Sequence, residues 1–396
     1  MTRSKQPQYR FDGFEGEWEE KELGDIVQIT MGQSPSSQNY TTNPSDYILV
    51  QGNADIKNGY VFPRVWTTQI TKQADKGDII LSVRAPVGDV GKTNYHVIIG
   101  RGVAAIKGNE FIFQILKYLK EIGYWKRIST GSTFDSISSS DIKYAKIQIP
   151  SLPEQEAIGE LFQMVDQLIQ LQDQKLATLK EQKQTFLRKM FPAQGQKVPE
   201  IRLQGFDGEW EENKLGEVSP LRGGYAFESD KFQSDGIKII RISNILSSGI
   251  IGGEFAHYHQ INNDDKYLLT GGSALIAMSG ATTGKVSILN TEEKYYQNQR
   301  VGYFMDLNKI HYNFIIAFLK SLNFNKQIQS VLVAGAQPNI SSKEIDNFQI
   351  LYPRHNVEQE AIGNFFQTLD QQIAQSEEKL TELKALKQTL LNRLFV

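Results

Sequence analysis

The chain has 396 residues, of which 40% are hydrophobic and 22% are charged, and it contains no cysteine. This length allows two or three packed domains, and the absence of cysteine excludes a disulfide framework, thiolate zinc sites and a cysteine nucleophile. The formal net charge of -2 gives no overall attraction to a polyanion. The sequence has neither the apolar core of a signal peptide nor a run of about 18 apolar residues that could span a membrane. We therefore expect a soluble cytoplasmic protein.

The chain contains two copies of one pattern. Residues 10–26 read RFDGFEGEWEEKELGDI and return at 202–218 as RLQGFDGEWEENKLGEV, so that Trp18 and Trp210 lie 192 positions apart. A second block, EQEAIGELFQMVDQLI from Glu154, returns 204 positions later as EQEAIGNFFQTLDQQI from Glu358. Such self-similarity indicates one architectural unit used twice. A tryptophan that recurs in both copies indicates an anchor within each domain rather than a side chain that stacks on bases.

Two stretches lie between the repeated blocks, at about 27–150 and 219–353. They differ in sequence, but the segments that predict turns, strands and helices follow one another in the same order. Each predicts a mixed α/β domain with a glycine-led turn, a β-rich run that enters a Gly-Lys loop, one helix and a short closing strand. The matching segments are the turns 32–36 and 223–229, the β-rich runs 77–92 and 272–285, the helices 111–128 and 314–332, and the strands 147–150 and 349–353.

Each second block predicts one long helix, the first over 154–191, because it lacks proline and its apolar residues recur in steps of four and three. Such a helix is about 57 Å long, enough to hold two domains a DNA turn apart. Polar residues interrupt both copies at the same places, Gln172 and Lys183 in the first and Ser376 and Lys387 in the second. Because a buried polar pair fixes register, we expect the two helices to pack against each other. The predicted seam consists of Ile158, Phe162, Val165, Ile169, Leu176, Leu179, Phe186 and Met190, with Ile362, Phe366, Leu369, Ile373, Leu380, Leu383, Leu390 and Leu394.

This order of segments resembles the specificity subunits of type I restriction-modification systems over essentially the whole chain. In that family two variable target-recognition domains alternate with two conserved helical regions. The phrases GEWEEKELG and GEWEENKLG, the PxxxEQxxIxxxL-type helix starts and the endings LRKMF and LNRLF also match it. The resemblance implies an α+β fold with two mixed α/β target-recognition domains, joined by two long helices that form an antiparallel coiled coil with a pseudo-twofold internal repeat. The implied segments are a first recognition domain at 1–150, a first helix at 151–192, a second recognition domain at 193–353 and a second helix at 354–396.

The resemblance also implies a function without catalysis in this chain. Each recognition domain would read one half of a bipartite target in the major groove of double-stranded DNA, and the helices would set the gap between the halves. Two adenine methyltransferase subunits would dock on the helices, and restriction/translocase subunits would complete the assembly. S-adenosylmethionine, ATP and Mg would then be held by those partners, with no cofactor and no metal in this chain.

The residues themselves give no sign of an active site. No Pro-Pro pair, as an adenine methyltransferase motif requires, occurs in the sequence. The Gly-Lys loop at 86–93 has proline where a P-loop begins with glycine, and the loop at 280–285 is one residue too short and is followed by valine. His257 and His259 would share a strand face, but too few ligands lie nearby, so we expect surface histidines and no metal site.

Local charge favours DNA binding in the first domain, because residues 76–146 hold eleven basic and six acidic side chains, an excess of about +5. Arg, Lys, Asn, Gln and Ser are the residue types that contact base edges, and solvated surface residues are the alternative for each candidate. The candidate DNA-binding residues are Gln33, Ser34, Arg84, Lys92 and Arg101 in the first domain, and Arg241, Ser279, Lys285, Gln299 and Arg300 in the second.

Three other functions stay open from the sequence. The first is an enzyme with its own nuclease or transferase site, which would need a catalytic constellation that the sequence does not offer and whose purified chain would modify or cut DNA alone. The other two are related to DNA specificity or to the helices. One is a specificity subunit that serves a fused restriction-modification enzyme, which neighbouring genes would reveal. The other is a coiled-coil adaptor that reads no DNA. An adaptor explains the helices, but it does not explain two divergent β-rich domains that are each flanked by the repeated sequence blocks. A DNA-specificity subunit is therefore the favoured interpretation.

Overall fold

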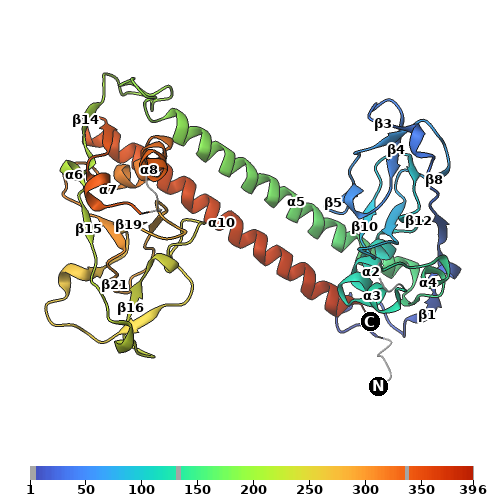
Figure 1. Cartoon of the computed structure of the whole chain (residues 1–396). Helices are drawn as coiled ribbons and strands as arrows, with labels where there is room; N and C mark the ends of the chain where they lie inside the picture. Colours follow the sequence, from blue (N-terminus) through green and yellow to red (C-terminus); the bar gives the residue numbers. More distant parts are fainter. Residues whose placement is uncertain (1–5, 131–134, 335–338, 396) are drawn as a thin grey trace. The chain divides into compact units, whose positions relative to one another are not determined.

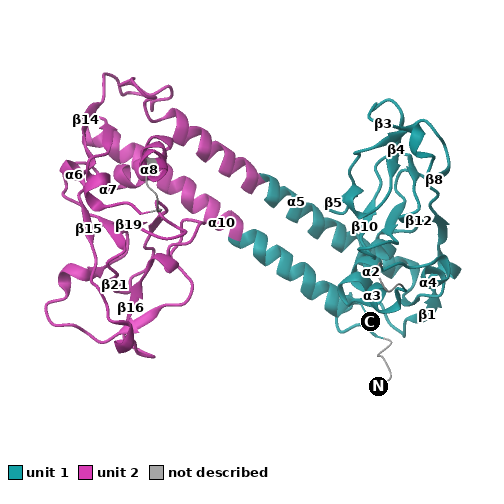
Figure 2. Cartoon of the chain, viewed as in Figure 1, with its two compact units in different colours: residues 1–174, 378–396 teal, residues 175–377 magenta. Residues whose placement is uncertain are grey.

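The computed structural model describes residues 6–130, 135–334 and 339–395. It divides into two compact units (Figure 2): unit 1 comprises residues 1–174 and 378–396, and unit 2 comprises residues 175–377. Both divisions fall inside the long helices α5 (Leu152–Lys189) and α10 (Asn356–Leu394). Each unit therefore contains one domain, the first half of the helix that follows it, and the second half of the other helix.

Unit 1 contains a six-stranded sheet in the order β2-β12-β9-β10-β6-β5, a five-stranded sheet in the order β3-β7-β4-β11-β8, and the pair β1-β13 (Figure 1). Its strands are β1 (Glu19–Glu22), β2 (Gln28–Met31), β3 (Tyr40–Thr41), β4 (Tyr47–Val50), β5 (Ile56–Lys57), β6 (Tyr60–Val61), β7 (Trp66–Thr67), β8 (Lys72–Ala74), β9 (Ile79–Ser82), β10 (Val90–Lys92), β11 (Val97–Ile99), β12 (Val103–Lys107) and β13 (Lys146–Ile149). Its shorter helices are α1 (Leu23–Ile26), α2 (Glu110–Glu121), α3 (Tyr124–Ile128) and α4 (Ser139–Lys143).

Unit 2 repeats this plan with smaller sheets, in the orders β15-β22-β19-β20 and β17-β16-β21-β18, and the pair β14-β23. Its strands are β14 (Glu211–Lys214), β15 (Leu221–Gly223), β16 (Ile237–Ile240), β17 (Ala256–Tyr258), β18 (Leu268–Leu269), β19 (Ala274–Ala277), β20 (Val286–Ile288), β21 (Tyr295–Gln297), β22 (Val301–Phe304) and β23 (Gln349–Tyr352). Its shorter helices are α6 (Leu215–Val218), α7 (Tyr312–Leu319), α8 (Leu322–Ala334) and α9 (Ser342–Asp346).

The central strand of each domain is apolar on both faces, and this explains its unbroken hydrophobic run. In β9, Ile79 and Leu81 pack into the core beneath the helices, whereas Ile80 packs into a second core with Val50 and Ile99. Because successive side chains of a strand point to opposite faces, one strand contributes to both cores. The corresponding strand β19 divides its residues between two cores in the same way. The predicted β-rich runs and closing strands are confirmed.

The single helix predicted after each β-rich run is wrong, because two helices occupy each place. Gly123 has φ 71°, in the left-handed region, and separates α2 from α3. A glycine adopts this conformation without a steric penalty, so it ends one helix and turns the chain into the next. In unit 2, Ser321 lies between α7 and α8, where its Oγ accepts a hydrogen bond from Phe324 N at 3.3 Å. This is an N-cap contact that starts a new helix.

The two repeated sequence blocks bind each other within each unit. Arg10 donates two hydrogen bonds of 2.8 Å to the carboxylate of Glu154, near the start of α5, and the Glu154 side chain is 1% exposed. Arg202 and Glu358 form the same pair in unit 2, at 2.8 and 2.9 Å. A buried carboxylate needs such a bidentate partner to offset its desolvation. The arginine and glutamate therefore recur together because each stabilises the burial of the other.

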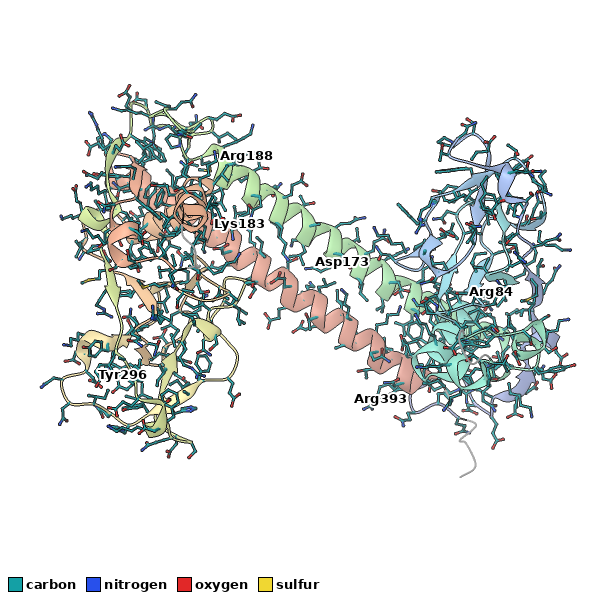
Figure 3. The ribbon with its side chains drawn as sticks, in the orientation of Figure 1. Arg84, Asp173, Lys183, Arg188, Tyr296 and Arg393 are labelled. Carbon is teal, nitrogen blue, oxygen red and sulfur yellow. The ribbon has the colours of Figure 1, made fainter. Side chains whose placement is uncertain are left out.

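The long helices contact each other in antiparallel orientation, and all sixteen predicted seam positions are buried or half-buried. In unit 1, Asp166 pairs with Lys387 at 2.6 Å and Asp173 with Lys384 at 3.7 Å. Later residues of α5 thus pair with earlier residues of α10, as antiparallel helices require. In unit 2, Lys180 pairs with Glu377 at 2.6 Å. Figure 3 labels Asp173 and Lys183 on α5.

The lysines that interrupt the seam are held by carboxylates of the opposite helix. Asp166 accepts from Lys387 at 2.6 Å and lies 3.5 Å from Lys117 of helix α2. In unit 2, Asp370 lies between Lys183 of α5 and Lys320 at the end of α7. Each carboxylate thus joins both long helices to a helix of the domain. Burial opposes ionisation of Asp166 and Asp370, but the paired lysines outweigh it and hold the pKa of each below its usual value.

An aromatic side chain at the end of each long helix completes a domain core. Phe395 lies 5.4 Å from the ring of Phe111 and 5.6 Å from that of Phe162. Phe191, which follows α5, lies 5.7 Å from Phe314 and 6.0 Å from Phe366. Both phenylalanines are almost fully buried. The phenylalanine of each LRKMF or LNRLF ending is therefore a core residue of the unit in which that helix ends.

Replacement of Phe395 by alanine should lower the free energy of unfolding of unit 1 by about 3–5 kcal/mol, because a buried phenylalanine leaves a cavity when it is truncated. Thermal unfolding of the full chain, followed by circular dichroism, would measure the loss. Phe62→Ala is the matched control, since the Phe62 side chain is 49% exposed. Equal shifts in both variants would contradict a core role for Phe395.

Lys117 should make stability depend on pH in the alkaline range. Burial lowers the pKa of Lys117 to about 8; Asp166 opposes this shift and Lys387 adds to it. Because the unfolded chain then binds more protons between about pH 8 and 10.5, wild-type stability should rise with pH across that window. Lys117→Met should remove this component. Urea unfolding at pH 7 to 10.5 would test it, with the exposed Lys126→Met as control; a variant with the wild-type pH profile would contradict the assignment.

Candidate nucleic-acid interface

Four chain segments meet at one edge of the first domain, and we call residues 32–34, 50–52, 83–84 and 100–102 the unit 1 junction. Backbone hydrogen bonds hold it: Gly32 N donates to Val103 O at 3.0 Å, Gly100 N to Val50 O at 2.8 Å, and Val83 N to Gly102 O at 2.9 Å. Ser34 adds a side-chain contact, because its Oγ accepts from Arg101 N at 3.1 Å. The junction is thus fixed by the main chain, and the side chains of Gln33, Arg84 and Arg101 remain exposed.

The same junction is present in the second domain, where residues 223–225, 240–242, 278–279 and 297–300 form the unit 2 junction. Tyr225 N donates to Gln297 O at 2.8 Å, Asn298 N to Ile240 O at 3.1 Å, and Met278 N to Arg300 O at 2.9 Å. The parallel strand pairs behind the junctions also match, with Ile98 opposite Leu49 in unit 1 and Ile239 opposite Tyr296 in unit 2. Tyr296 is labelled in Figure 3.

Glycine is required where the segments cross. A Cβ at Gly32 would lie 2.1 Å from Gly100 O, and a Cβ at Gly102 would lie 2.0 Å from Gln51 O. In unit 2, a Cβ at Gly224 would lie 2.2 Å from Gln297 O. Real Cβ atoms do not approach carbonyl oxygens so closely, so any larger residue would force the backbones apart. The glycine-led turns at 32 and 223 are therefore crossing points that both domains share.

Eight of the ten candidate residues lie at the two junctions. In unit 1 these are the exposed Gln33, Arg84 and Arg101 and the half-buried Ser34; Arg84 is labelled in Figure 3. In unit 2 they are the exposed Gln299 and Arg300, the half-buried Arg241 and the buried Ser279. The junctions bring together residues that are up to about 70 positions apart in the sequence.

The remaining two candidates, Lys92 and Lys285, do not belong to this set. Lys92 is bound by the carboxylate of Glu110, and its ammonium lies 5.1 Å from the centre of the Phe113 ring. Lys285 is exposed on the loop that follows Ser279. Although each lysine ends a Gly-Lys loop, the two do not occupy equivalent positions. Ala277 N donates to Lys285 O at 3.0 Å, as Ser82 N donates to Asp89 O at 2.8 Å. The residue of unit 1 that is equivalent to Lys285 is therefore Asp89.

The structure adds Arg222 and Gln297, which sequence reasoning missed, to the unit 2 junction. Arg222 donates to Gln297 Oε1 at 3.2 Å, and its guanidinium lies 4.7 Å from the centre of the Tyr303 ring. Within the described part of the chain, Nε of Arg222 and Nε of Arg241 are buried without a hydrogen-bond partner. Burial lowers the pKa of Arg222. The position of Arg222 directly before the Gly-Gly turn was the available signal.

A hairpin next to the unit 1 junction presents further aromatic and basic side chains. Its turn is Asn58-Gly59, with φ values of 53° and 78°, as a two-residue hairpin turn requires. Tyr60 and Phe62 are 44% and 49% exposed, and the Lys57 ammonium lies 5.3 Å from the centre of the Phe62 ring. Asn-Gly in the sequence was the signal for this hairpin. The hairpin follows junction residues 50–52 in the chain and adds Lys57, Tyr60 and Phe62 to the candidate residues.

Among the described residues, no group of three or more His, Asp or Glu side chains is arranged to hold a metal ion. His257 lies in β17, and His259 stacks on Tyr258 with ring centroids 4.4 Å apart. Across residues 6–130, 135–334 and 339–395, no helix is both long and apolar enough to cross a membrane.

A family model described as the type I restriction modification DNA specificity domain matches residues 15–181 and 207–385. The chain belongs to this family. Each match covers one repeat, and each includes one junction.

Similar curated proteins carry related names. The putative type I restriction enzyme MjaX specificity subunit of Methanocaldococcus jannaschii is 36% identical over 180 residues, which cover 43% of this chain and 42% of that protein. This alignment thus spans less than half of that relative. The type I restriction enzyme MjaVIII specificity subunit of the same organism is 23% identical over 394 residues, which cover 96% of this chain and 92% of that protein.

Solved structures show the same fold. The crystal structure of the type I restriction-modification S subunit from M. genitalium superposes with a TM-score of 0.69 at 18% identity, over 99% of each chain. The predicted fold, two mixed α/β domains with two long contacting helices, is thereby confirmed.

Arg101→Ala should weaken binding of the full chain to a mixed-sequence DNA duplex and reduce the slope of log affinity against log salt by about 1, because an exposed cation is lost. Lys92→Ala is the matched control, since Lys92 is neutralised by Glu110. It should leave DNA affinity unchanged and lower the thermal midpoint instead. Fluorescence anisotropy at several salt concentrations would measure both, and the reverse pattern would exclude the junction as the contact surface.

Proposed function

We propose that this chain is the non-catalytic specificity subunit of a type I restriction-modification complex, and that it binds double-stranded DNA through its two junctions. One observation carries the proposal: the same backbone junction is built twice, yet equivalent positions carry different side chains. Gln33 corresponds to Tyr225, and Arg84 to Ser279. A surface that reads sequence should differ between two halves of a split target, whereas a structural surface should repeat.

The junction side chains have the chemistry of base recognition. An arginine such as Arg101 can donate two hydrogen bonds to guanine, and a glutamine such as Gln299 can bond adenine in the same bidentate manner. Arg84 and Arg300 are suited to phosphates or to guanine. Each well-placed bidentate pair contributes about 1–3 kcal/mol of discrimination between bases. Two unlike junctions would therefore specify two unlike half-sites.

The partners follow from the family. Specificity subunits of type I systems work with methyltransferase and restriction subunits, and we infer that two adenine methyltransferase subunits dock on α5 and α10. Those subunits would supply S-adenosylmethionine, and the restriction/translocase subunits would supply ATP and Mg chemistry. Such an assembly would act on chromosomal and invading DNA in the cytoplasm. This chain would recognise the DNA target and provide the docking surface for the other subunits.

Two alternatives are distinguished by simple observations. A specificity subunit that serves a fused restriction-modification enzyme would have a single neighbouring gene that encodes both activities. A coiled-coil adaptor would have no need of two junctions with arginine and glutamine on a fixed backbone. The buried, unpartnered Nε atoms of Arg222 and Arg241 also favour a ligand with acceptor atoms at the unit 2 junction.

Expression of this chain with the methyltransferase encoded beside it, in a host without DNA methylation, should produce methylated adenines in one split motif with a fixed gap. Sequencing that detects modified bases would map them. The control omits this chain. A second control carries Arg101→Ala, which should degrade one half of the motif and preserve the other. Methylation that is unchanged without this chain would exclude the specificity role and favour the adaptor.

A further inference from the structure

One flank of the helix pair in unit 1 carries an exposed apolar patch. Met164, Leu168 and Leu171 of α5 are 56%, 52% and 62% exposed, and Leu386 of α10 is 48% exposed. We call these four residues the α5/α10 patch. The three α5 positions are separated by four and three residues, so they form one stripe along the helix.

Helix geometry places Leu386 on the same flank as the α5 stripe. Leu168 directly precedes the seam residue Ile169, and Leu386 directly precedes the seam lysine Lys387. The residue that precedes a seam position lies on the same flank in both helices, and the twofold relation of antiparallel helices keeps equal flanks on one side. The ion pairs Asp166–Lys387 and Asp173–Lys384 set the register. They bring Leu386 level with Leu168, so the patch spans both helices.

The equivalent surface of unit 2 is polar. The positions that correspond to Met164, Leu168 and Leu171 are Thr368, Gln372 and Gln375 on α10, and the position that corresponds to Leu386 is Gln182 on α5. All four are exposed. Because the seam itself repeats between the helices and this flank does not, packing of the helix pair does not require the apolar side chains. Four exposed apolar side chains on a coiled coil are instead typical of a protein contact.

The chemistry of the patch excludes DNA as its occupant. Between Leu161 and Gln172 the only charged residue of α5 is Asp166, and its carboxylate is occupied by Lys117 and Lys387. Phosphates require cations, and the nearest cations of α10, Lys384 and Lys387, are paired with Asp173 and Asp166. Four half-exposed side chains also fall well short of the roughly 800 Å² per partner that a stable dimer buries. The patch is therefore suited to anchor one part of a larger interface with another kind of protein.

We propose that the patch is an apolar anchor for a methyltransferase subunit, and that the two methyltransferase sites of this chain are consequently unequal. The inference rests on the proposed function, which assigns docking of methyltransferases to these helices. One subunit binds unit 1 tightly through the patch, and the other binds the polar surface of unit 2 more weakly. Assembly then proceeds through an intermediate with one methyltransferase.

Titration of the full chain with the methyltransferase encoded beside it tests this, with stoichiometry read by native mass spectrometry and affinity by sedimentation velocity. Wild type should bind two copies in separate steps, the first at least tenfold tighter. Leu168→Gln with Leu171→Gln copies the unit 2 surface and should weaken the first step about tenfold. The reciprocal Gln372→Leu with Gln375→Leu should strengthen the second step.

A matched control is Ala177→Gln with Glu181→Gln, two exposed positions of α5 away from this flank, which should leave both steps unchanged. Unchanged thermal midpoints would establish that the variants fold. Two equal steps in wild type that the patch variant leaves unaltered would overturn this proposal and leave the proposed function standing. A wild-type chain that dimerises through the patch would also overturn it. Failure of wild type to bind any methyltransferase would overturn the proposed function itself.

Discussion

The fold depends on the burial of one phenylalanine at the end of each long helix. Phe395 fills the aromatic core of unit 1 beside Phe111 and Phe162, and Phe191 does the same in unit 2. These side chains reach their cores through helices that begin in the other unit. A helix end that frays or slips would therefore open a domain core, at a cost of several kcal/mol. Helix packing and domain folding are energetically coupled in both directions.

This coupling separates the parts of the sequence that must repeat from those that can differ. The paired Arg10 and Glu154, with Trp18 beside them, support the start of α5, and loss of Glu154 would leave the buried Trp18 Nε1 without its acceptor. The junctions are different, because glycines and backbone hydrogen bonds hold them together. Their exposed side chains contribute little to the fold, so Arg84 and Arg101 can be exchanged for other residues without loss of structure. Divergence is concentrated where stability permits it.

Periodicity was sufficient to predict the long helices, the seam and the central strands, because these elements bury residues at regular spacing. It failed at the short helices, where Gly123 and Ser321 break a continuous apolar pattern through local backbone geometry. The Gly-Lys loop that ends each β-rich run also led to an equivalent role for Lys92 and Lys285, which is wrong. The pairing of Lys92 with Glu110 depends on tertiary contact between β10 and α2, which spacing alone does not reveal. Eight candidates lie at the junctions because glycine-led turns and strand ends mark them in the sequence.

The polar residues that interrupt the seam fix the register of α5 and α10, and this allows the outer surfaces of the helix pair to differ between the two units. The two lysines do not pair with each other; Lys387 binds Asp166, and Lys183 binds Asp370. A slip of one heptad would separate both pairs and leave charges half-buried, so these pairs select a single register. Once these pairs have fixed the register, the flank that carries the α5/α10 patch is not needed for packing of the two helices. Selection for partners can then act on it independently, and an apolar flank on one half of a symmetric scaffold is the result to be expected.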